Sequence, residues 1–219
     1  MIEIAPGLHQ IPLAPRQSVN AYLMGDVLVD AGMRWSARRL LSALKGRSLS
    51  AHVLTHAHPD HQGASHAVCE ALDLPLLCHP LERAAAESGK VTSGYPNPRG
   101  LVARLQDRIA GPGHPVARTL EEGDGIGGFT VVHAPGHTRG QIAFWRASDR
   151  ILVAGDAALG MNLVTTAPGL DLPLRMATTD MDEARRSIRK LAALDPARVV
   201  FGHGPAADGA AFRRFAETV

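Results

Sequence analysis

The start of the chain alternates short apolar runs with turn residues. Apolar segments lie at 2–4, 8–13, 19–24 and 26–30, and Pro6-Gly7, Pro15 and Gly25-Asp26 separate them. Short apolar runs that end at proline or glycine are typical of strands, because these residues interrupt a ladder of backbone hydrogen bonds. The pattern therefore predicts a sheet at the start of the chain.

Two segments have the spacing of an amphipathic helix instead. Leucines recur at helical intervals within 36–45, where Ser36 is the candidate N-cap. In 181–194 the apolar side chains fall on one helical face, and Asp180 is the candidate N-cap. Both segments are expected to cover a sheet with their apolar faces.

The rest of the chain continues this mixture of strands and helices. Further strands are predicted at 51–55, 74–79, 128–133, 141–146, 150–154 and 197–202, and further helices at 63–72 and 206–216. Segment 86–118 is rich in proline and glycine and is predicted to be an insertion or lid with one short helix at 101–110. Residues 160–175 are predicted to be a loop. Strands interleaved with helices favour one domain in which two sheets pack together with helices outside.

Composition restricts the partners of this domain. The 219 residues are 45% hydrophobic and 20% charged, with a net charge of +2 and no dense run of lysine and arginine, so a nucleic-acid partner is not expected. No apolar stretch is long enough for a membrane span, and no signal peptide is visible. Cys69 and Cys78 form no disulfide framework, which indicates reduced thiols and a cytoplasmic protein. The sequence does not indicate an oligomeric state.

The segment THAHPDHQG, at 55–63, carries the chemistry. His56 and His58 are two residues apart, so in an extended backbone both imidazoles point the same way and can reach one metal ion. Asp60 and His61 follow after a proline and present a carboxylate and an imidazole to a second position nearby. Imidazole with carboxylate suits zinc, and iron or manganese as well.

One loop cannot complete two metal sites, and three further candidate ligands follow later strands. His137, Asp156 and His203 each come directly after a predicted strand, and each lies beside a glycine. Glycine allows the backbone to turn sharply or to approach another segment closely. Several strands are therefore expected to deliver ligands to one edge of the domain.

These pieces together resemble the metallo-β-lactamase superfamily. The resemblance is carried by the H-x-H-x-D-H run at 56–61, Gly-His-Thr at 136–138, Gly-Asp at 155–156, Gly-His at 202–203, and the segments VNAYL at 19–23 and VLVDAG at 27–32. It spans about residues 8 to 205, with the motifs in the expected order. It implies an α+β fold, a single-domain four-layer αββα sandwich, and places the chain near the glyoxalase II-like and lactonase-like branch.

The resemblance also implies a role for each candidate ligand. His56, His58 and His137 would hold one metal ion, and Asp60, His61 and His203 a second. Asp156 would bridge the two ions, and Asp30 would be the carboxylate that orients the histidine loop.

Such a centre predicts hydrolysis. Two divalent ions, with zinc favoured, share a hydroxide and lower the pKa of water from 15.7 to about 7, which supplies a nucleophile at neutral pH. Asp60 is the candidate catalytic residue, because it could both bind metal and pass a proton to the leaving group. A small-molecule ester, thioester or lactone is favoured over a β-lactam, and a phosphodiester is disfavoured further.

Two alternatives stay open: a mono-iron persulfide or sulfur dioxygenase on the same fold, and a non-catalytic metal-binding protein. The substrate is also undecided, because ALGMNL after Asp156 departs from the glyoxalase II pattern and no tyrosine matches the lactonase position. Arg139 stands where many relatives have proline. Candidates for the wall of the substrate pocket are Met33, Trp35, Tyr95, Arg139, Met161 and Asn162, with plain packing as the alternative for Met33 and Trp35.

Overall fold

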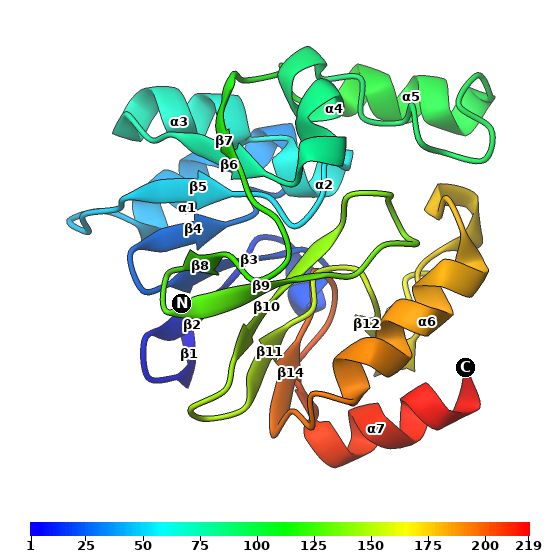
Figure 1. The fold of residues 1–219 in the computed structure, drawn as a ribbon. Helices are drawn as coiled ribbons and strands as arrows, with labels where there is room; N and C mark the ends of the chain where they lie inside the picture. Colours follow the sequence, from blue (N-terminus) through cyan, green and yellow to red (C-terminus); the bar gives the residue numbers. More distant parts are fainter.

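The computed structural model describes residues 1–219 and places two sheets face to face (Figure 1). The first sheet contains seven strands in chain order: β1 (Ile2–Ala5), β2 (Leu8–Pro12), β3 (Asn20–Met24), β4 (Val27–Val29), β5 (Ala51–Val53), β6 (Leu76–Cys78) and β7 (Val116–Thr119). Pairing is antiparallel from β1 to β4 and parallel from β4 to β7. The parallel part lets several strands end at the same edge.

The second sheet contains six strands in the order β15 (Ala207–Asp208), β14 (Arg198–Val200), β11 (Ile151–Val153), β10 (Ile142–Arg146), β9 (Phe129–His133) and β8 (Gly125–Ile126). Only β11 and β14 run parallel to each other. A separate hairpin joins β12 (Leu159–Met161) to β13 (Pro168–Asp171).

Seven helices accompany these sheets, and most of them pack on an outer face. They are α1 (Ala37–Ala43), α2 (Pro59–Gln62), α3 (Ser65–Leu72), α4 (Arg83–Ser88), α5 (Leu101–Ile109), α6 (Met181–Ala192) and α7 (Gly209–Thr218), with short 3₁₀ turns at Pro15–Gln17, Arg34–Ser36, Pro80–Glu82 and Arg175–Ala177. None of these helices is both long and apolar enough to cross a membrane.

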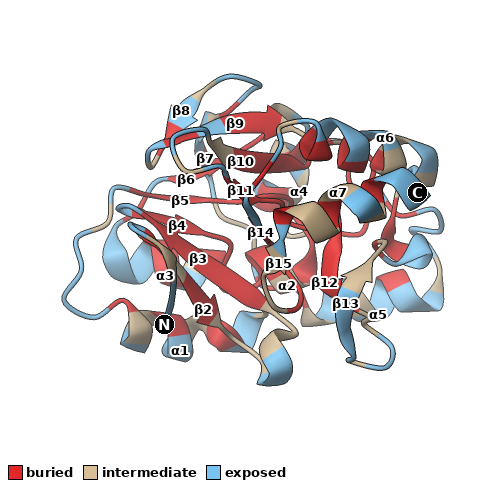
Figure 2. Ribbon diagram, turned by 90° about the horizontal axis from the view of Figure 1, so that it is seen from below, coloured by how far each residue is buried: buried red, intermediate tan, exposed pale blue.

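Burial separates the layers. One apolar core lies between the sheets and includes Tyr22 of the first sheet and Phe144 of the second. Leu40 of α1 and Val68 of α3 pack on the outer side of the first sheet, and Phe212 of α7 packs on the second. Figure 2 shows the strands as mostly buried and the outward helix faces as exposed. The αββα sandwich expected from the resemblance is therefore confirmed, as a single domain.

Three local expectations were wrong. Residues 116–119 form β7 beside β6, so the end of segment 86–118 belongs to the first sheet, and α4 overlaps the start of the segment. Residues 160–175 are not all loop, because 159–161 pairs with 168–171. Ser36 is not a cap: the chain is already helical there, and its side chain accepts no capping hydrogen bond. Asp180 does cap α6, with its carboxylate accepting the backbone N–H groups of 182 and 183.

Candidate metal centre

The seven candidate ligands come from the ends of four strands. His56 and His58 follow β5, Asp60 and His61 lie in α2, and His137, Asp156 and His203 follow β9, β11 and β14. Pro59 at the first helical position fixes the turn into α2. The structure brings all seven together at one edge of the sandwich, although four segments far apart in sequence supply them.

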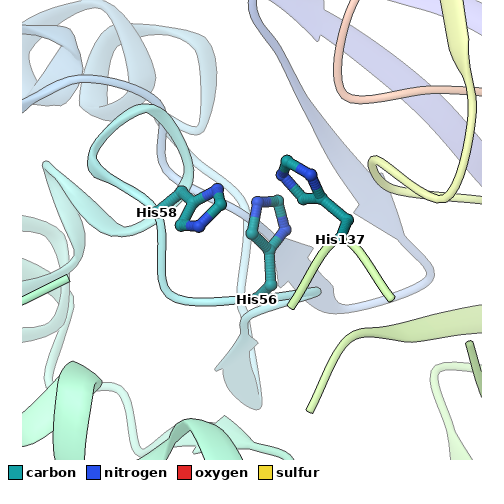
Figure 3. A group of neighbouring side chains, drawn as sticks. All are labelled: His56, His58 and His137. Carbon is teal, nitrogen blue, oxygen red and sulfur yellow. The ribbon is translucent and has the colours of Figure 1, made fainter. Parts of the chain in front are cut away.

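The side chains form three overlapping groups. In each group the candidate ligand atoms lie within 4.8 Å of one another: His56 with His58 and His137, His56 with His61 and Asp156, and Asp60 with His61 and His203. In Figure 3 the rings of His56, His58 and His137 turn toward one another. Their ring centres are 4.5–4.8 Å apart. The overlap gives one continuous centre with two halves.

Asp156 lies between these halves. Its Oδ1 is 3.5 Å from His61 Nε2, and its Oδ2 is 3.0 Å from His203 Nε2 and 3.8 Å from His137 Nε2. Asp60 Oδ2 is 3.3 Å from His203 Nε2, so this carboxylate belongs to the second half alone. A carboxylate between two groups of imidazoles has the arrangement that a bridging ligand needs.

Hydrogen bonds at the rear of the rings determine which nitrogen faces the centre. His61 Nδ1–H donates to Asp30 Oδ2 at 2.8 Å, and His203 Nδ1–H donates to the carbonyl oxygen of Ser18. The Thr178 hydroxyl donates to the carbonyl of Leu174, so its oxygen accepts from His137 Nδ1–H at 3.1 Å. Each Nε2 thereby faces the centre, where a bound metal ion would take the place of any proton on this atom.

Asp30 organises the second half through side chains. It follows β4 in the left-handed conformation, with φ of +57°. Its carboxylate accepts hydrogen bonds of 2.8 Å from the Thr55 N–H, the Thr55 hydroxyl and His61 Nδ1. The Thr55 oxygen, having donated to Asp30, accepts from His56 Nδ1–H at 3.1 Å. The orienting role that the resemblance implied for Asp30 therefore has a structural basis.

Glu82 is a second buried carboxylate, and the sequence analysis missed it. Its Oε2 accepts the N–H of Ala57, between His56 and His58, and its Oε1 accepts the N–H of Gly140, in the loop after His137; both distances are 2.9 Å. Glu82 therefore joins the two loops that supply the three-histidine half. No local motif marks it, because both partners are backbone groups distant in sequence.

The residues fit a metal. Four buried ligand atoms have no hydrogen-bond partner in the protein: His56 Nε2, His61 Nε2, His137 Nε2 and Asp156 Oδ1. Buried polar atoms without partners are costly, so their convergence calls for a cation. The close packing also explains why residue 202 is a glycine, because a Cβ there would lie 2.1 Å from Asp156 Oδ1.

The two halves differ electrostatically. Burial, followed by the neighbouring imidazoles, lowers the pKa of His56 and His58, and burial lowers the pKa of His137 to about 4. In the second half burial also disfavours charge, but Asp156 outweighs it and raises the pKa of His61 and brings that of His203 to about 10. Neutral imidazoles thus face a carboxylate-rich half.

A narrow cleft of about 60 Å³ opens onto the centre. Besides five of the candidate ligands, it is lined by Tyr95, Gln106, Leu159, Leu163, Leu174 and Ala177. Tyr95 is buried, stacks edge-on against His58 at 4.9 Å and donates its hydroxyl to Gln106. Part of segment 86–118 therefore forms a wall of the cleft.

Of the six residues named as candidates for the pocket wall, only Tyr95 lines this cleft. Trp35 is exposed and lines a different hollow beside Arg38. Met33, two residues before Trp35, lines neither the cleft nor that hollow. Arg139 lines a third hollow next to Asp180. Met161 is fully buried, and Asn162 caps the turn of the β12–β13 hairpin. Proximity in sequence to a ligand did not bring these side chains to the cleft.

Comparison with known proteins agrees with this geometry. The sequence model described as Metallo-beta-lactamase superfamily matches residues 14–203. "Probable metallo-hydrolase YflN" of Bacillus subtilis (strain 168) is 33% identical over 243 aligned positions, which cover 96% of this chain and 89% of that protein.

Two solved structures have the same architecture over nearly their whole length. The crystal structure of BLEG-1 B3 metallo-beta-lactamase has a TM-score of 0.73 and 30% identity, covering 93% of this chain and 94% of that one. The crystal structure of TTHA1623 in a di-iron-bound form has a TM-score of 0.71 and 33% identity, covering 94% and 97%.

Proposed function

This chain belongs to the metallo-β-lactamase superfamily and is a metal-dependent hydrolase, and we propose that it uses two metal ions to cleave an uncharged ester, thioester or lactone. His56, His58 and His137 would hold one ion, Asp60, His61 and His203 the other, and Asp156 would bridge them. The proposal depends on the four buried ligand atoms that converge without a protein partner.

When bound, two divalent ions supply Lewis acidity that activates water and polarises the carbonyl group under attack. The protein contributes orientation, because the Nδ1–H groups of His56, His61, His137 and His203 are all engaged at the rear of the rings. Rings held in this way keep their Nε2 atoms aimed at the centre.

Asp60 is the residue suited to move the proton. Its side chain is 31% exposed, whereas that of Asp156 is 5% exposed, and Asp60 lines the cleft. Although burial opposes the charge, the hydrogen bond from His203 lowers the pKa of Asp60, so it is a carboxylate at neutral pH. It can accept a proton from the attacking water and pass it to the leaving group.

The cleft wall supports an uncharged substrate. Leu159, Leu163, Leu174 and Ala177 form its apolar side, while Tyr95 and Gln106 provide polar atoms at the other. No lysine or arginine lines the cleft, so apart from the proposed metal ions no cationic side chain would offset the charge of a phosphodiester or a substrate carboxylate. An acyl group with an apolar chain fits this lining better than an anionic substrate does.

Zinc is the metal that we propose for the centre, because imidazole and carboxylate with open positions are a common zinc donor set. The same donors accept iron, and the TTHA1623 neighbour was solved in a di-iron-bound form. Cys69 and Cys78 are both buried and unpaired, which supports our further proposal of a cytoplasmic, reducing location.

Metal content and substrate preference of the purified protein test the proposal together. We expect two metal ions per chain and hydrolysis that is highest for uncharged esters, thioesters and lactones, lower for β-lactams and lowest for phosphodiesters. His58→Ala should abolish hydrolysis and leave the circular dichroism spectrum unchanged, whereas the control His9→Ala, on β2 outside the centre, should keep full activity. One iron per chain with oxygen consumption on a persulfide would overturn the two-metal hydrolase.

A further inference from the structure

A second cluster of metal-binding side chains lies outside the cleft, between α3 and the loop before β7. His66 and Glu70 are four residues apart on α3, so they share one face of the helix. His114 approaches them from the loop: its Nδ1 is 3.2 Å from His66 Nδ1 and 3.8 Å from Glu70 Oε1. The ligand atoms of all three lie within 4.8 Å of one another.

The backbone holds His114 in this position. Its N–H donates to the carbonyl of Ala86 in α4 at 3.0 Å. Three residues earlier, Gly111 approaches Gly63 so closely that a Cβ would lie 1.8 Å from the Gly63 carbonyl oxygen. The loop is therefore seated against both α4 and the turn between α2 and α3, and His114 meets His66 without rearrangement.

The spacing of the two imidazoles suits a tetrahedral ion. Zinc–nitrogen bonds of about 2.0–2.1 Å in a tetrahedron place two nitrogens about 3.3 Å apart. The observed 3.2 Å between the two Nδ1 atoms is close to that edge. The His114 side chain is 13% exposed, and Glu70 is 64% exposed, so the carboxylate can turn toward an ion held by the two rings.

We propose that His66, Glu70 and His114 form a third metal site, for a divalent transition ion of the zinc class. Two imidazoles and one carboxylate would bind the ion, and water would complete its coordination. The ion would join α3 to the end of segment 86–118, whose residues Tyr95 and Gln106 line the cleft. This site is independent of hydrolysis, because none of its residues lines the cleft or belongs to the seven-residue centre.

Zinc titration of the two-metal enzyme tests the proposal, with calorimetry and elemental analysis as readouts. We expect one further zinc ion per chain beyond the two of the centre. His114→Gln and His66→Gln should each weaken binding of this ion by at least about 10-fold, the lower limit for a disturbed ligand environment. His9→Gln is the matched control, since this histidine lies in none of the clusters, and it should bind the ion as the wild type does.

The same variants separate this site from the catalytic centre. His114→Gln should keep two ions and full hydrolysis, so its loss of the third ion is distinguishable from failure of the centre. Added zinc should also slow proteolysis within 89–100 in the wild type and not in His114→Gln. Absence of a third ion in the wild type, or unchanged zinc affinity in both histidine variants, would show that His66 and His114 are only a hydrogen-bonded pair.

Discussion

The two halves of the candidate metal centre are organised by different means. The two loops of the three-histidine half are joined through the main chain, because Glu82 accepts a backbone N–H group from each loop that carries its imidazoles. The second half has direct side-chain support, because Asp30 accepts from the His61 ring itself, whereas it reaches His56 only through the Thr55 hydroxyl. Each half thus has its own buried carboxylate behind it.

The difference extends to charge. Burial keeps the three imidazoles of the first half neutral, whereas Asp156 raises the pKa of His61 and His203 in the second. The first half is a set of neutral donors already in the form that binds metal, and the second balances its charge internally. Asp156, which lies between them, is the group on which both depend.

Removal of Asp156 should therefore have the largest effect. Asp156→Ala takes a carboxylate from both halves at once, so we expect loss of metal and a fall in kcat/KM of at least about 1,000-fold, equivalent to several kcal/mol of transition-state stabilisation. Metal analysis and steady-state kinetics measure this. Asp149→Ala, which removes a carboxylate paired with Arg146 away from the centre, should change neither. Two retained ions with near-normal turnover would refute the bridging role.

His52 provides a buried histidine to compare with the ligands. It lies on β5, just before the histidine loop, and both ring nitrogens are occupied: Nδ1–H donates to the Leu28 carbonyl at 3.1 Å, and Nε2 accepts from the Ser65 hydroxyl at 2.8 Å. Burial lowers its pKa to about 4, although the hydrogen bond to Leu28 and the charge of Asp30 oppose this shift, and His114 adds to it. A histidine without a free nitrogen is structural.

This structural role predicts a dependence of stability on pH. Between pH 6.5 and about 4 the unfolded chain binds a proton at His52 that the folded chain does not, so the free energy of unfolding falls as pH falls. At 1.36 kcal/mol per pH unit the loss is about 3 kcal/mol. Urea unfolding of wild type and His52→Gln across this range measures it, and the variant should have the shallower slope. Equal slopes would assign the acid sensitivity to other groups.

Paired substitutions of the supporting carboxylates should separate the two halves. Asp30→Asn should weaken binding of the ion held by Asp60, His61 and His203 more than binding of the other ion, because Asp30 contacts His61 directly and His56 only through Thr55. Glu82→Gln should weaken binding of the ion held by His56, His58 and His137. Each loss of affinity should be about 10- to 100-fold. In Glu82→Gln the amide group can accept only one of the two N–H groups that the carboxylate accepts.

Stepwise cobalt titration followed by absorption spectra can resolve the two ions in these variants. If Asp30 and Glu82 support different ions, each variant should lose most of its cobalt affinity at a different step of the titration. If both weaken the same ion, or both ions equally, the division of support between Asp30 and Glu82 is incorrect.

The convergence of the seven candidate ligands was predictable from sequence, because four of them lie in one short run after β5 and the other three each follow an apolar strand of the second sheet. Their roles as ligands stay a prediction until metal is measured. The sandwich followed from the same strand pattern and the resemblance. Glu82 was not predictable, since its contacts to Ala57 and Gly140 depend on how distant loops meet.

The cleft wall and two short elements were missed for related reasons. β7 has only one buried residue, Val116, and β12–β13 contains Gly160, Pro168 and Gly169, so neither has the apolar alternation of a strand. Leu163, Leu174 and Ala177 reach the cleft only because the hairpin and the following turn fold over it. Tertiary packing, rather than local pattern, determines these positions.

Substitution of Arg139 should have the smallest effect on catalysis, because this residue follows His137 by two positions yet its side chain lines a hollow other than the cleft. Its side chain is exposed and lines a hollow with Leu81 and Asp180 instead of the cleft. Because Arg139 does not line the cleft, we expect Arg139→Ala to change kcat/KM by less than about 2-fold, which corresponds to less than about 0.5 kcal/mol of transition-state stabilisation. Leu174→Asn, by contrast, alters the apolar cleft wall and should raise KM for substrates with an apolar acyl chain. If Arg139→Ala lowered kcat/KM more than Leu174→Asn does, the substrate would bind over the hollow lined by Arg139, and the proposed role of the apolar cleft wall would be incorrect.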